Sequence, residues 1–275
     1  RSRHTRTLGF ILPDLENPSY ARIAKRLEQG ARAHGYQLLI ASSDDDAASE
    51  LQLLQLFRAR RCDALFVASC LPASDESYRE LQAKGTPVIA IDRMMDPAQF
   101  CSVISDDRNA SLQLTQSLLL PKPRHIALIG ARPELSISQV RTEGFNTALA
   151  DFDGTVLVEH SEYFSREGGQ QSMLALLDQL GHLPDALVTT SYVLLQGVFD
   201  VLQQRPLDSQ ALHLGTFGDT QLLDFLPLPV NAMAQQHDMI ASKALELALA
   251  AVEQKHYEPG VNALARTFKQ RIHEA

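Results

Sequence analysis

The sequence predicts an α/β protein made of two parallel, doubly wound sheets, each covered by helices. Short apolar runs alternate with helical patterns along nearly the whole chain, and this alternation starts again near residue 101. Strands separated by helices need right-handed crossovers, which place the strands parallel and the helices on both faces of a sheet. The 275 residues, 45% of them apolar, are enough to fill two hydrophobic cores.

Four apolar runs in the first part of the chain have the length of buried strands. A helical pattern follows the first run, since apolar residues recur at steps of three and four from Tyr20 to Ala31, and Gly35 follows as a stop signal. Leu51, Leu54 and Phe57 repeat this pattern in a second helix. The predicted strands are LGFILP (8–13), YQLLIAS (36–42), ALFVAS (64–69) and TPVIAID (86–92).

Five further runs predict strands in the second part: 101–106, 125–130, 155–161, 186–191 and 211–218, with helices at about 109–120, 137–150, 167–180 and 192–204. Nine parallel strands would make one unusually wide sheet, so two sheets are expected. A strand at 229–235 leads into a long helix at about 237–254. Because no Gly/Ser linker separates the halves, several short crossings between two lobes are expected rather than one tether.

Charge and cysteine content limit the possible partners and location. The net charge of -8 disfavours nucleic-acid binding over most of the surface, and no run is long enough to span a membrane. Three cysteines without metal-binding spacing fit a reducing compartment, so we expect a cytoplasmic protein. The basic start, with Arg1, Arg3, His4 and Arg6, is either a solvated terminus or the remnant of a linker to a basic module.

Polar side chains gather where the predicted strands end, which is where ligands bind open α/β sheets. Asp and Asn suit sugar hydroxyls, an aromatic ring suits the sugar's apolar face, and arginine with helix N–H groups suits a phosphate. Pro18 favours the first turn of a helix, so the N–H groups of Ser19 and Tyr20 are expected to be available to a ligand. Asn17 or Ser19 is alternatively a simple helix N-cap.

Three charged residues are candidates for holding a ligand. Asp92 and Arg93 end a predicted strand. They contact a ligand, or else Arg93 pairs with Asp96 or Asp92 binds a loop amide. Arg141 lies in the first turns of a helix, where a cation gains nothing from the helix dipole and needs an anion. That anion is either a ligand or a neighbouring carboxylate, Glu134 or Glu143.

Signatures of enzymes and metal sites are missing. The sequence has no dinucleotide-binding glycine motif, no phosphate loop, no nucleophile elbow and no metal-binding histidine spacing. We therefore expect no enzymatic activity, no catalytic residue, no cofactor and no metal. A polar cleft without an evident nucleophile predicts a binding protein.

Several blocks of the sequence resemble one known family. LGFILPDLENPSYARIAKRLEQGARAHGYQLLIA, TPVIAIDR, VRTEGFNTAL, PDALVTTS and GTFGD are similar to the effector-binding region of the lactose-repressor family, along nearly the whole chain. PDLENPSY, GYQLLIAS, TTSYVLLQGVFDV and TFGDTQLLDFL further resemble a branch of that family whose effector is fructose 1-phosphate. The resemblance implies a periplasmic-binding-protein-like clamshell with three interlobe crossings.

The resemblance also implies a domain division and an effector site. Residues 1–7 are the linker remnant after a helix-turn-helix head, 8–104 with 236–258 form the N-terminal lobe, and 105–235 with 259–275 form the C-terminal lobe. The implied effector-binding residues are Asn17, Ser19, Tyr20, Asp92, Arg93, Arg141, Ser191, Phe217 and Asp219. Gly218 replaces an aspartate common in the family, so Asp219 or the backbone is expected to supply that contact.

The implied function is an effector-sensing core of a transcriptional regulator, a homodimer or homotetramer that contacts operator DNA only through its missing N-terminal domain. A phosphosugar in the interlobe cleft releases the DNA. The residues leave open the order of affinity among fructose 1-phosphate, fructose 1,6-bisphosphate and fructose. The rival interpretations are a periplasmic sugar-binding protein of a transport system and an enzyme acting on a phosphosugar.

Overall fold

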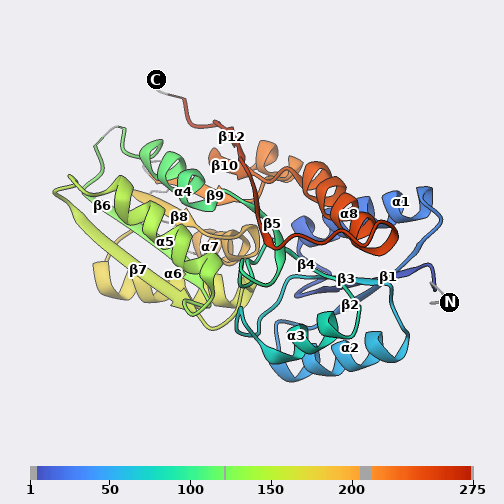
Figure 1. Cartoon of the computed structure of the whole chain (residues 1–275). Helices are drawn as coiled ribbons and strands as arrows, with labels where there is room; N and C mark the ends of the chain where they lie inside the picture. The colour runs from blue at the N-terminus through green and yellow to red at the C-terminus, as the bar shows by residue number, and fades with distance from the viewer. Residues whose placement is uncertain (1–4, 121, 205–211, 274–275) are drawn as a thin grey trace. The chain divides into compact units, whose positions relative to one another are not determined.

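The chain forms two compact units in a computed structural model that describes residues 5–120, 122–204 and 212–273. The first unit comprises Arg1–Ser105 and Gln236–Leu264, and the second comprises Asp106–Gln235 and Ala265–Ala275. Each unit contains one six-stranded sheet with helices on both faces (Figure 1). The predicted fold class, two parallel α/β sheets, is confirmed.

The first unit has an all-parallel sheet in the order β11-β5-β4-β3-β1-β2. Helices α1 and α8 pack on one face of this sheet, and α2 and α3 pack on the other. Figure 1 shows α1 beside α8, although more than 200 residues separate them along the chain. The elements are β1 (Thr7–Leu12), α1 (Pro18–Ala33), β2 (Gln37–Ser42), α2 (Ala47–Ala59), β3 (Ala64–Val67), α3 (Glu76–Ala83), β4 (Val88–Ile91), β5 (Cys101–Ser105), α8 (His237–Glu253) and β11 (Gly260–Leu264).

The second unit repeats this plan with the order β12-β10-β9-β8-β6-β7. Helices α6 and α7 cover one face and α4 and α5 the other, while β12 runs antiparallel to β10. The elements are α4 (Asp107–Gln116), β6 (His125–Ala131), α5 (Ser136–Ala148), β7 (Thr155–Ser161), α6 (Arg166–Leu180), β8 (Ala186–Thr189), α7 (Tyr192–Gln204), β9 (His213–Phe217), the 3-10 helix η2 (Gln221–Phe225), β10 (Val230–Ala234) and β12 (Thr267–Lys269).

The C-terminal part of the chain differs from the predicted division. We expected residues 259–275 in the second lobe, but β11 (Gly260–Leu264) pairs with β5 in the first sheet. The last passage between the units therefore comes after Leu264, and the others come after Ser105 and Gln235. At the other end, the expected linker at 1–7 runs into β1 at Thr7, and Arg1, Arg3 and His4 lie outside the described residues.

The order of the strands places a switch point in each sheet. β1 has β2 on one side and β3 on the other, and β6 has β7 and β8 in the same way. Crossover connections leave such a point in opposite directions, which opens a crevice at the carboxyl ends of the central strands. The segments after β1 and β3 in the first unit, and after β6 and β8 in the second, are therefore the places to look for a ligand site.

Candidate functional site

Tyr20 and Asp92 meet at the carboxyl edge of the first sheet. Tyr20 lies in the first turn of α1 and is 6% exposed, and its hydroxyl donates to Asp92 Oδ2 at 2.6 Å. Asp92 directly follows β4 in a left-handed conformation, with a φ of 66°. Burial, followed by the charge of Asp92, raises the pKa of Tyr20 well above its ordinary value, so this hydroxyl stays a donor.

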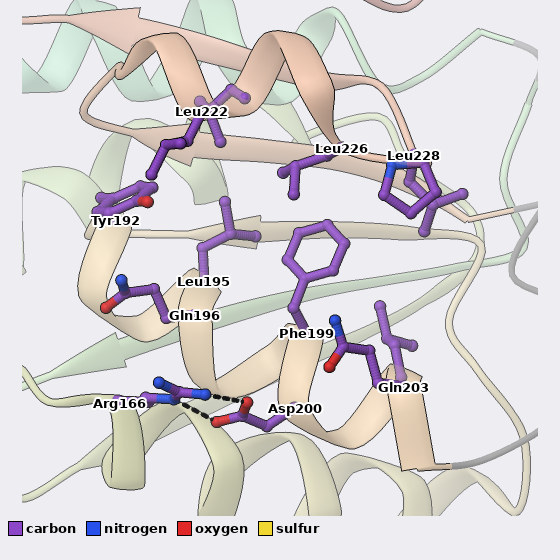
Figure 2. Close-up of a pocket in the computed structure, with 13 residues that line it drawn as sticks. Arg166, Tyr192, Leu195, Gln196, Phe199, Asp200, Gln203, Leu222, Leu226 and Leu228 are labelled. Carbon is purple, nitrogen blue, oxygen red and sulfur yellow. Dashed lines mark hydrogen bonds and ion pairs between the residues drawn. The ribbon is translucent and has the colours of Figure 1, made fainter.

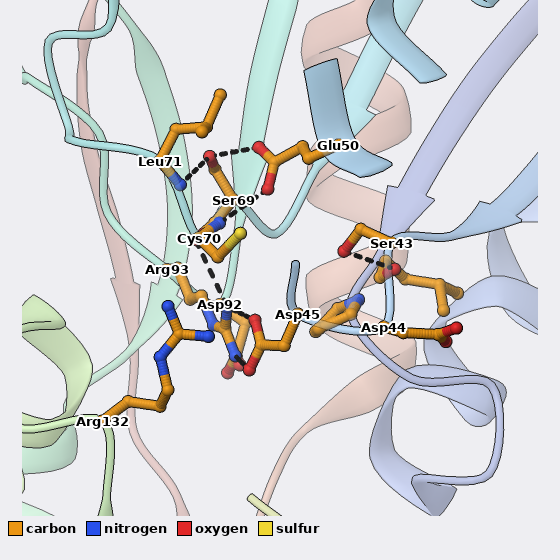
Figure 3. A network of polar contacts seen from close by, with 12 residues as sticks. Ser43, Asp44, Asp45, Glu50, Ser69, Cys70, Leu71, Asp92, Arg93 and Arg132 are labelled. Carbon is orange, nitrogen blue, oxygen red and sulfur yellow. Dashed lines mark hydrogen bonds and ion pairs between the residues drawn. The ribbon is translucent and has the colours of Figure 1, made fainter. Parts of the chain in front are cut away.

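Arg93 is buried and paired with an aspartate from a neighbouring loop (Figure 3). Its Nη1 and Nη2 donate to the two carboxylate oxygens of Asp45 at 2.5 and 3.0 Å, and Nη1 also lies 3.3 Å from the Ser69 carbonyl oxygen. Burial by itself lowers the pKa of Arg93, but Tyr20 and Asp45 raise it above its ordinary value. The expected alternative partner, Asp96, is therefore wrong, because the loop after β2 supplies the carboxylate.

A second buried carboxylate fixes the loop after β3. Glu50, on α2, is fully buried and accepts hydrogen bonds from the Ser69 and Tyr78 hydroxyls and, at 2.8 Å, from the Cys70 backbone N–H. Burial, with the Glu50 contact, raises the pKa of the Cys70 thiol to about 12, so the thiol stays protonated. Figure 3 shows how Ser69 links this group to Arg93.

Asn17 is the N-cap of α1, and Ser19 is the residue whose backbone N–H it binds. The Asn17 side chain accepts from the Ser19 backbone N–H at 3.0 Å, and Pro18 occupies the first helical position. The expectation that the Ser19 N–H is available to a ligand is therefore wrong, because the cap already occupies it. Tyr20 keeps its place at the site through its side chain.

Arg141 is the centre of the polar cluster in the second unit. It is 6% exposed on α5, and its Nε and Nη2 lie 2.8 and 2.7 Å from Asp107 Oδ2. Its Nη1 donates to the Thr190 carbonyl oxygen, directly after β8, at 2.7 Å. The guanidinium lies 4.6 Å above the centre of the Phe217 ring. Phe217 is thus a buried platform under the cation.

The expected alternative partners of Arg141 are both wrong. Glu134 pairs with Arg132 at 2.6 Å, and Glu143 pairs with Arg108. The carboxylate that binds Arg141 is Asp107, the first residue of α4, because α4 and α5 pack against each other on one face of the sheet.

The remaining two predicted residues, Ser191 and Asp219, come shortly after the ends of β8 and β9. Ser191 precedes α7, and its carbonyl oxygen accepts from the Leu195 N–H at 3.2 Å. Asp219 follows Gly218, which has a φ of 88°, and lies 2.5 Å from Lys269 Nζ and 2.8 Å from Arg271 Nη2. Asp219 therefore binds two cations of the C-terminal segment.

Each cluster contains one of the buried polar atoms that lack a hydrogen-bond partner within the described part of the chain. These two atoms are Arg93 Nε in the first unit and Thr190 Oγ1 in the second. Leaving a buried donor unsatisfied costs about 1–3 kcal/mol, so such atoms are suited to a polar ligand.

The sequence interpretation missed Asp45, Asp107 and Arg266. Asp45 and Asp107 follow β2 and β5, so the rule that singled out Asp92 could also have found them. Arg266 carried no local signal, because its importance comes from a contact with Asp107, 159 residues away.

A separate groove of about 510 Å³ lies on the second unit (Figure 2). One face of α7 forms one wall, η2 and the segment after it form the other, and Arg166 pairs with Asp200 at one end. The apolar lining residues include Leu195, Phe199, Leu222, Leu226 and Leu228. The groove is mostly apolar, unlike the two charged clusters.

No metal site or membrane segment is visible in residues 5–120, 122–204 and 212–273. Every helix in these ranges is too short or too polar to span a bilayer. The same ranges contain no cluster of three or more His, Cys, Asp or Glu side chains placed to hold a metal ion.

Comparisons with known proteins connect these clusters to one family. A model described as periplasmic binding proteins and sugar binding domain of LacI family matches residues 5–206. A crystal structure of the Cra transcriptional dual regulator from Pseudomonas putida in complex with fructose 1-phosphate is 76% identical. The match covers 98% of this chain and 100% of the chain in that crystal structure, with a TM-score of 0.97.

Two curated relatives lie in the same branch. The fructose operon regulatory protein of Vibrio cholerae is 46% identical over 98% of this chain and 82% of its own length. The catabolite repressor/activator of Escherichia coli K12 is 38% identical over 98% of this chain and 81% of its own length. The resemblance stated from the sequence is confirmed.

Proposed function

The chain belongs to the family of periplasmic binding proteins and sugar-binding domains of the LacI type, and we propose that it senses fructose 1-phosphate. It is an effector-binding domain of the fructose and catabolite repressor type. The observation that carries the proposal is its 76% identity to a regulator whose crystal structure contains fructose 1-phosphate.

The two charged clusters support an anionic sugar as the effector. Arg93 and Arg141 are buried. A guanidinium group suits a phosphate better than the ammonium group of lysine does, because it can donate two parallel hydrogen bonds to it. Tyr20 and Asp92 offer contacts suited to sugar hydroxyls, and Arg93 Nε and Thr190 Oγ1 offer buried polar atoms. In this proposal Asn17, as the N-cap that accepts from the Ser19 N–H, places Tyr20.

Effector binding controls DNA binding through differential affinity. A ligand that binds one conformation more tightly shifts the equilibrium towards it, by a coupling free energy of typically about 1–3 kcal/mol. In the proposal, DNA is contacted by a helix-turn-helix segment outside the sequence described here, and effector binding releases the operator. The relatives extend beyond the matched region, which covers 82% and 81% of their lengths. A regulator that binds operator DNA works where the DNA is, so the proposal includes a cytoplasmic location.

A homodimer fits both the proposed function and the groove on the second unit. A regulator that reads two operator half-sites pairs its subunits. Near the groove, η2 exposes two large apolar side chains, Leu222 at 63% and Phe225 at 82%. Exposed apolar surface of this kind marks an interaction site. We assign it to a second copy of this chain.

Calorimetry of the purified chain with fructose 1-phosphate, fructose 1,6-bisphosphate and fructose, measured side by side, tests the proposal. Saturable binding of fructose 1-phosphate is expected, at a lower Kd than for fructose, because the phosphate adds charge-assisted hydrogen bonds. Tighter binding of fructose, or no binding of either phosphosugar, would contradict the proposal.

The two rival functions have their own readouts. A transport receptor predicts a monomer and a signal peptide in the gene upstream of Arg1, whereas the regulator predicts a helix-turn-helix there. An enzyme predicts turnover, so fructose 1-phosphate is incubated with concentrated protein and then quantified. The proposal expects the ligand to be recovered unchanged.

A further inference from the structure

Arg266 binds the same carboxylate as Arg141. It follows the last passage between the units, and its side chain is 3% exposed. Its Nε donates to Asp107 Oδ1 at 2.6 Å, and its Nη2 lies 3.5 Å from Oδ2. Its Nη1 lies 3.3 Å from the Met233 carbonyl oxygen on β10. Asp107 is therefore shared between two arginines.

Phe217 stacks against both cations of this cluster. The guanidinium carbons of Arg141 and Arg266 lie 4.6 and 5.1 Å from the centre of its ring. The Phe217 residue is 2% exposed. The negative face of an aromatic ring attracts a cation, and the attraction is stronger where water is excluded. The platform holds the two guanidinium groups close to each other.

The three charged groups of this cluster have a net charge of +1. They are two guanidinium groups and one carboxylate, all nearly buried. Among the described residues of the second unit, the neighbouring carboxylates have other contacts: Glu143 pairs with Arg108, Asp219 pairs with Lys269 and Arg271, and Asp106 caps α4 by accepting from Asn109. A buried charge without a counter-charge is destabilising. An anion that binds beside such a charge removes this destabilisation, which favours its binding.

Arg266 changes the net charge that a ligand meets at Arg141 and Asp107. Without Arg266, Arg141 and Asp107 form a neutral pair, and a phosphate meets the repulsion of Asp107 at close range. With Arg266, the charge of Asp107 is already balanced, and Arg141 faces a ligand as a full cation. The effect is purely electrostatic and needs no contact between Arg266 and the effector.

We propose that Arg266 is a positioning residue that sets the preference of this site for a phosphorylated over a neutral sugar, acting through Asp107 on Arg141. This inference rests on the proposed function, because it concerns the same effector. It assigns a role in ligand choice to the segment after the last passage between the units, where the sequence carried no signal.

Two substitutions at Arg266 separate its charge from its packing. Arg266→Met removes the charge and keeps most of the volume, whereas Arg266→Lys keeps the charge and loses the two-pronged contact. Arg108→Met is the matched control, because Arg108 is the neighbour of Asp107 and also links α4 to α5, but on the exposed side. Calorimetry with fructose 1-phosphate and with fructose is carried out on all four proteins.

Arg266→Met is expected to weaken fructose 1-phosphate binding by about 10- to 100-fold, as loss of one nearby unit charge does at intermediate dielectric. Fructose affinity and the Arg108→Met control are expected to stay within about twofold of wild type. Arg266→Lys is expected to recover most of the loss. Urea unfolding shows that each variant folds, and Arg266→Gln replaces Arg266→Met if that variant does not.

The inference is overturned if Arg266→Met binds fructose 1-phosphate like wild type, if Arg266→Lys loses as much affinity as Arg266→Met, or if fructose affinity falls in parallel. The last result assigns Arg266 a merely structural role. A wild-type chain that binds no phosphosugar instead overturns the proposed function, so the two failures are distinguishable.

Discussion

Arg93 and Arg141 are both buried and both bound to an aspartate, yet they differ in what surrounds their partners. Asp107 also binds Arg266, and Asp45 accepts hydrogen bonds from both Nη1 and Nη2 of Arg93. The effect of each substitution on folding therefore depends on the charge that it leaves behind. Removing one member of a buried ion pair leaves the other charge uncompensated.

Arg93→Ala is expected to lower the free energy of unfolding by about 3–5 kcal/mol, because it breaks a two-pronged buried ion pair with Asp45. Arg141→Ala is expected to cost less than about 3 kcal/mol, the lower end of the cost of leaving a buried charge unpaired, because Arg266 remains on Asp107. Urea unfolding at pH 7 measures both. Equal losses would show that the second arginine does not compensate the charge of Asp107.

The same two variants are expected to weaken fructose 1-phosphate binding by about 2–4 kcal/mol each, because a buried phosphate loses a charged partner. Arg166→Ala is the control, since Arg166 is an exposed arginine that pairs with Asp200 away from both clusters. Calorimetry compares the three. Wild-type affinity in Arg141→Ala would contradict its assigned role.

Tyr20 predicts a dependence of stability on alkaline pH. Its pKa is raised in the folded protein, chiefly by burial, while in the unfolded chain it is about 10. Its contribution is fully present below pH 10 and is lost as pH rises above it, by at most about 1.4 kcal/mol per pH unit. Tyr20→Phe should therefore show a flatter fall in the free energy of unfolding between pH 9 and 11, and parallel curves would refute this.

At the scale of the elements, the spacing of α5 from α4 decides where Arg141 lies. Gly144 allows the two helices to approach closely: a Cβ at this position would lie 2.3 Å from the Arg108 carbonyl oxygen and 2.7 Å from Ser111 Cβ. Backbone cannot yield as a flexible side chain does. Any side chain here pushes α5 away, together with Arg141 and its contact to Asp107.

Gly144→Ala is expected to destabilise the protein by about 1–3 kcal/mol and to weaken fructose 1-phosphate binding. Gly169→Ala is the matched control: its Cβ would lie 2.1 Å from the Leu194 carbonyl oxygen, in the contact between α6 and α7. This control should cost similar stability and leave more of the affinity. Urea unfolding and calorimetry measure both, and equal loss of affinity would contradict the argument.

The elements that the sequence predicted are those whose apolar residues form a short continuous run or a helical repeat between polar segments. Strands β3 and β4 are runs of four buried apolar residues, and β8 has three such residues before the buried Thr189, so their identity is evident from the sequence. β11 alternates between half-buried and exposed residues at the edge of a sheet, and β12 has only three residues. Both escaped prediction, because an edge strand is specified by the partner that it finds rather than by its own pattern.

For the whole molecule, effector binding and self-association should both be measurable on this chain. A ligand that binds only the folded state stabilises it by about 2.7 kcal/mol at a free concentration 100 times its Kd. Fructose 1-phosphate should therefore raise the Tm, and fructose should do so less. The mostly apolar lining of the groove on the second unit fits the proposed self-association better than it fits a phosphosugar.

If the chain forms the proposed dimer, Leu222→Asp combined with Phe225→Asp is expected to turn it into a monomer, because charge on both exposed side chains makes burial against a second copy costly. Sedimentation velocity measures the assembly, and calorimetry with fructose 1-phosphate serves as the control for folding. Leu15→Asp, an exposed leucine on the first unit, should leave the assembly unchanged. A double variant that stays dimeric would assign the interface elsewhere.

The sequence by itself determined the alternation of strand and helix, the two sheets and the strand ends where polar side chains gather. These features follow from local periodicity, since the pattern of apolar residues within a short window indicates a buried strand or an amphipathic helix. It also singled out Arg93 and Arg141. What it left open was which anion each arginine binds in the folded chain.

Only the tertiary structure decided those pairings. Asp45 lies 48 residues from Arg93, Asp107 lies 34 residues from Arg141, and Arg266 reaches Asp107 across 159 residues. The nearer carboxylates Glu134 and Glu143 pair with other arginines. The strength of a buried ion pair depends on distance in space and on exclusion of water, and both arise only once the helices have packed on the sheet.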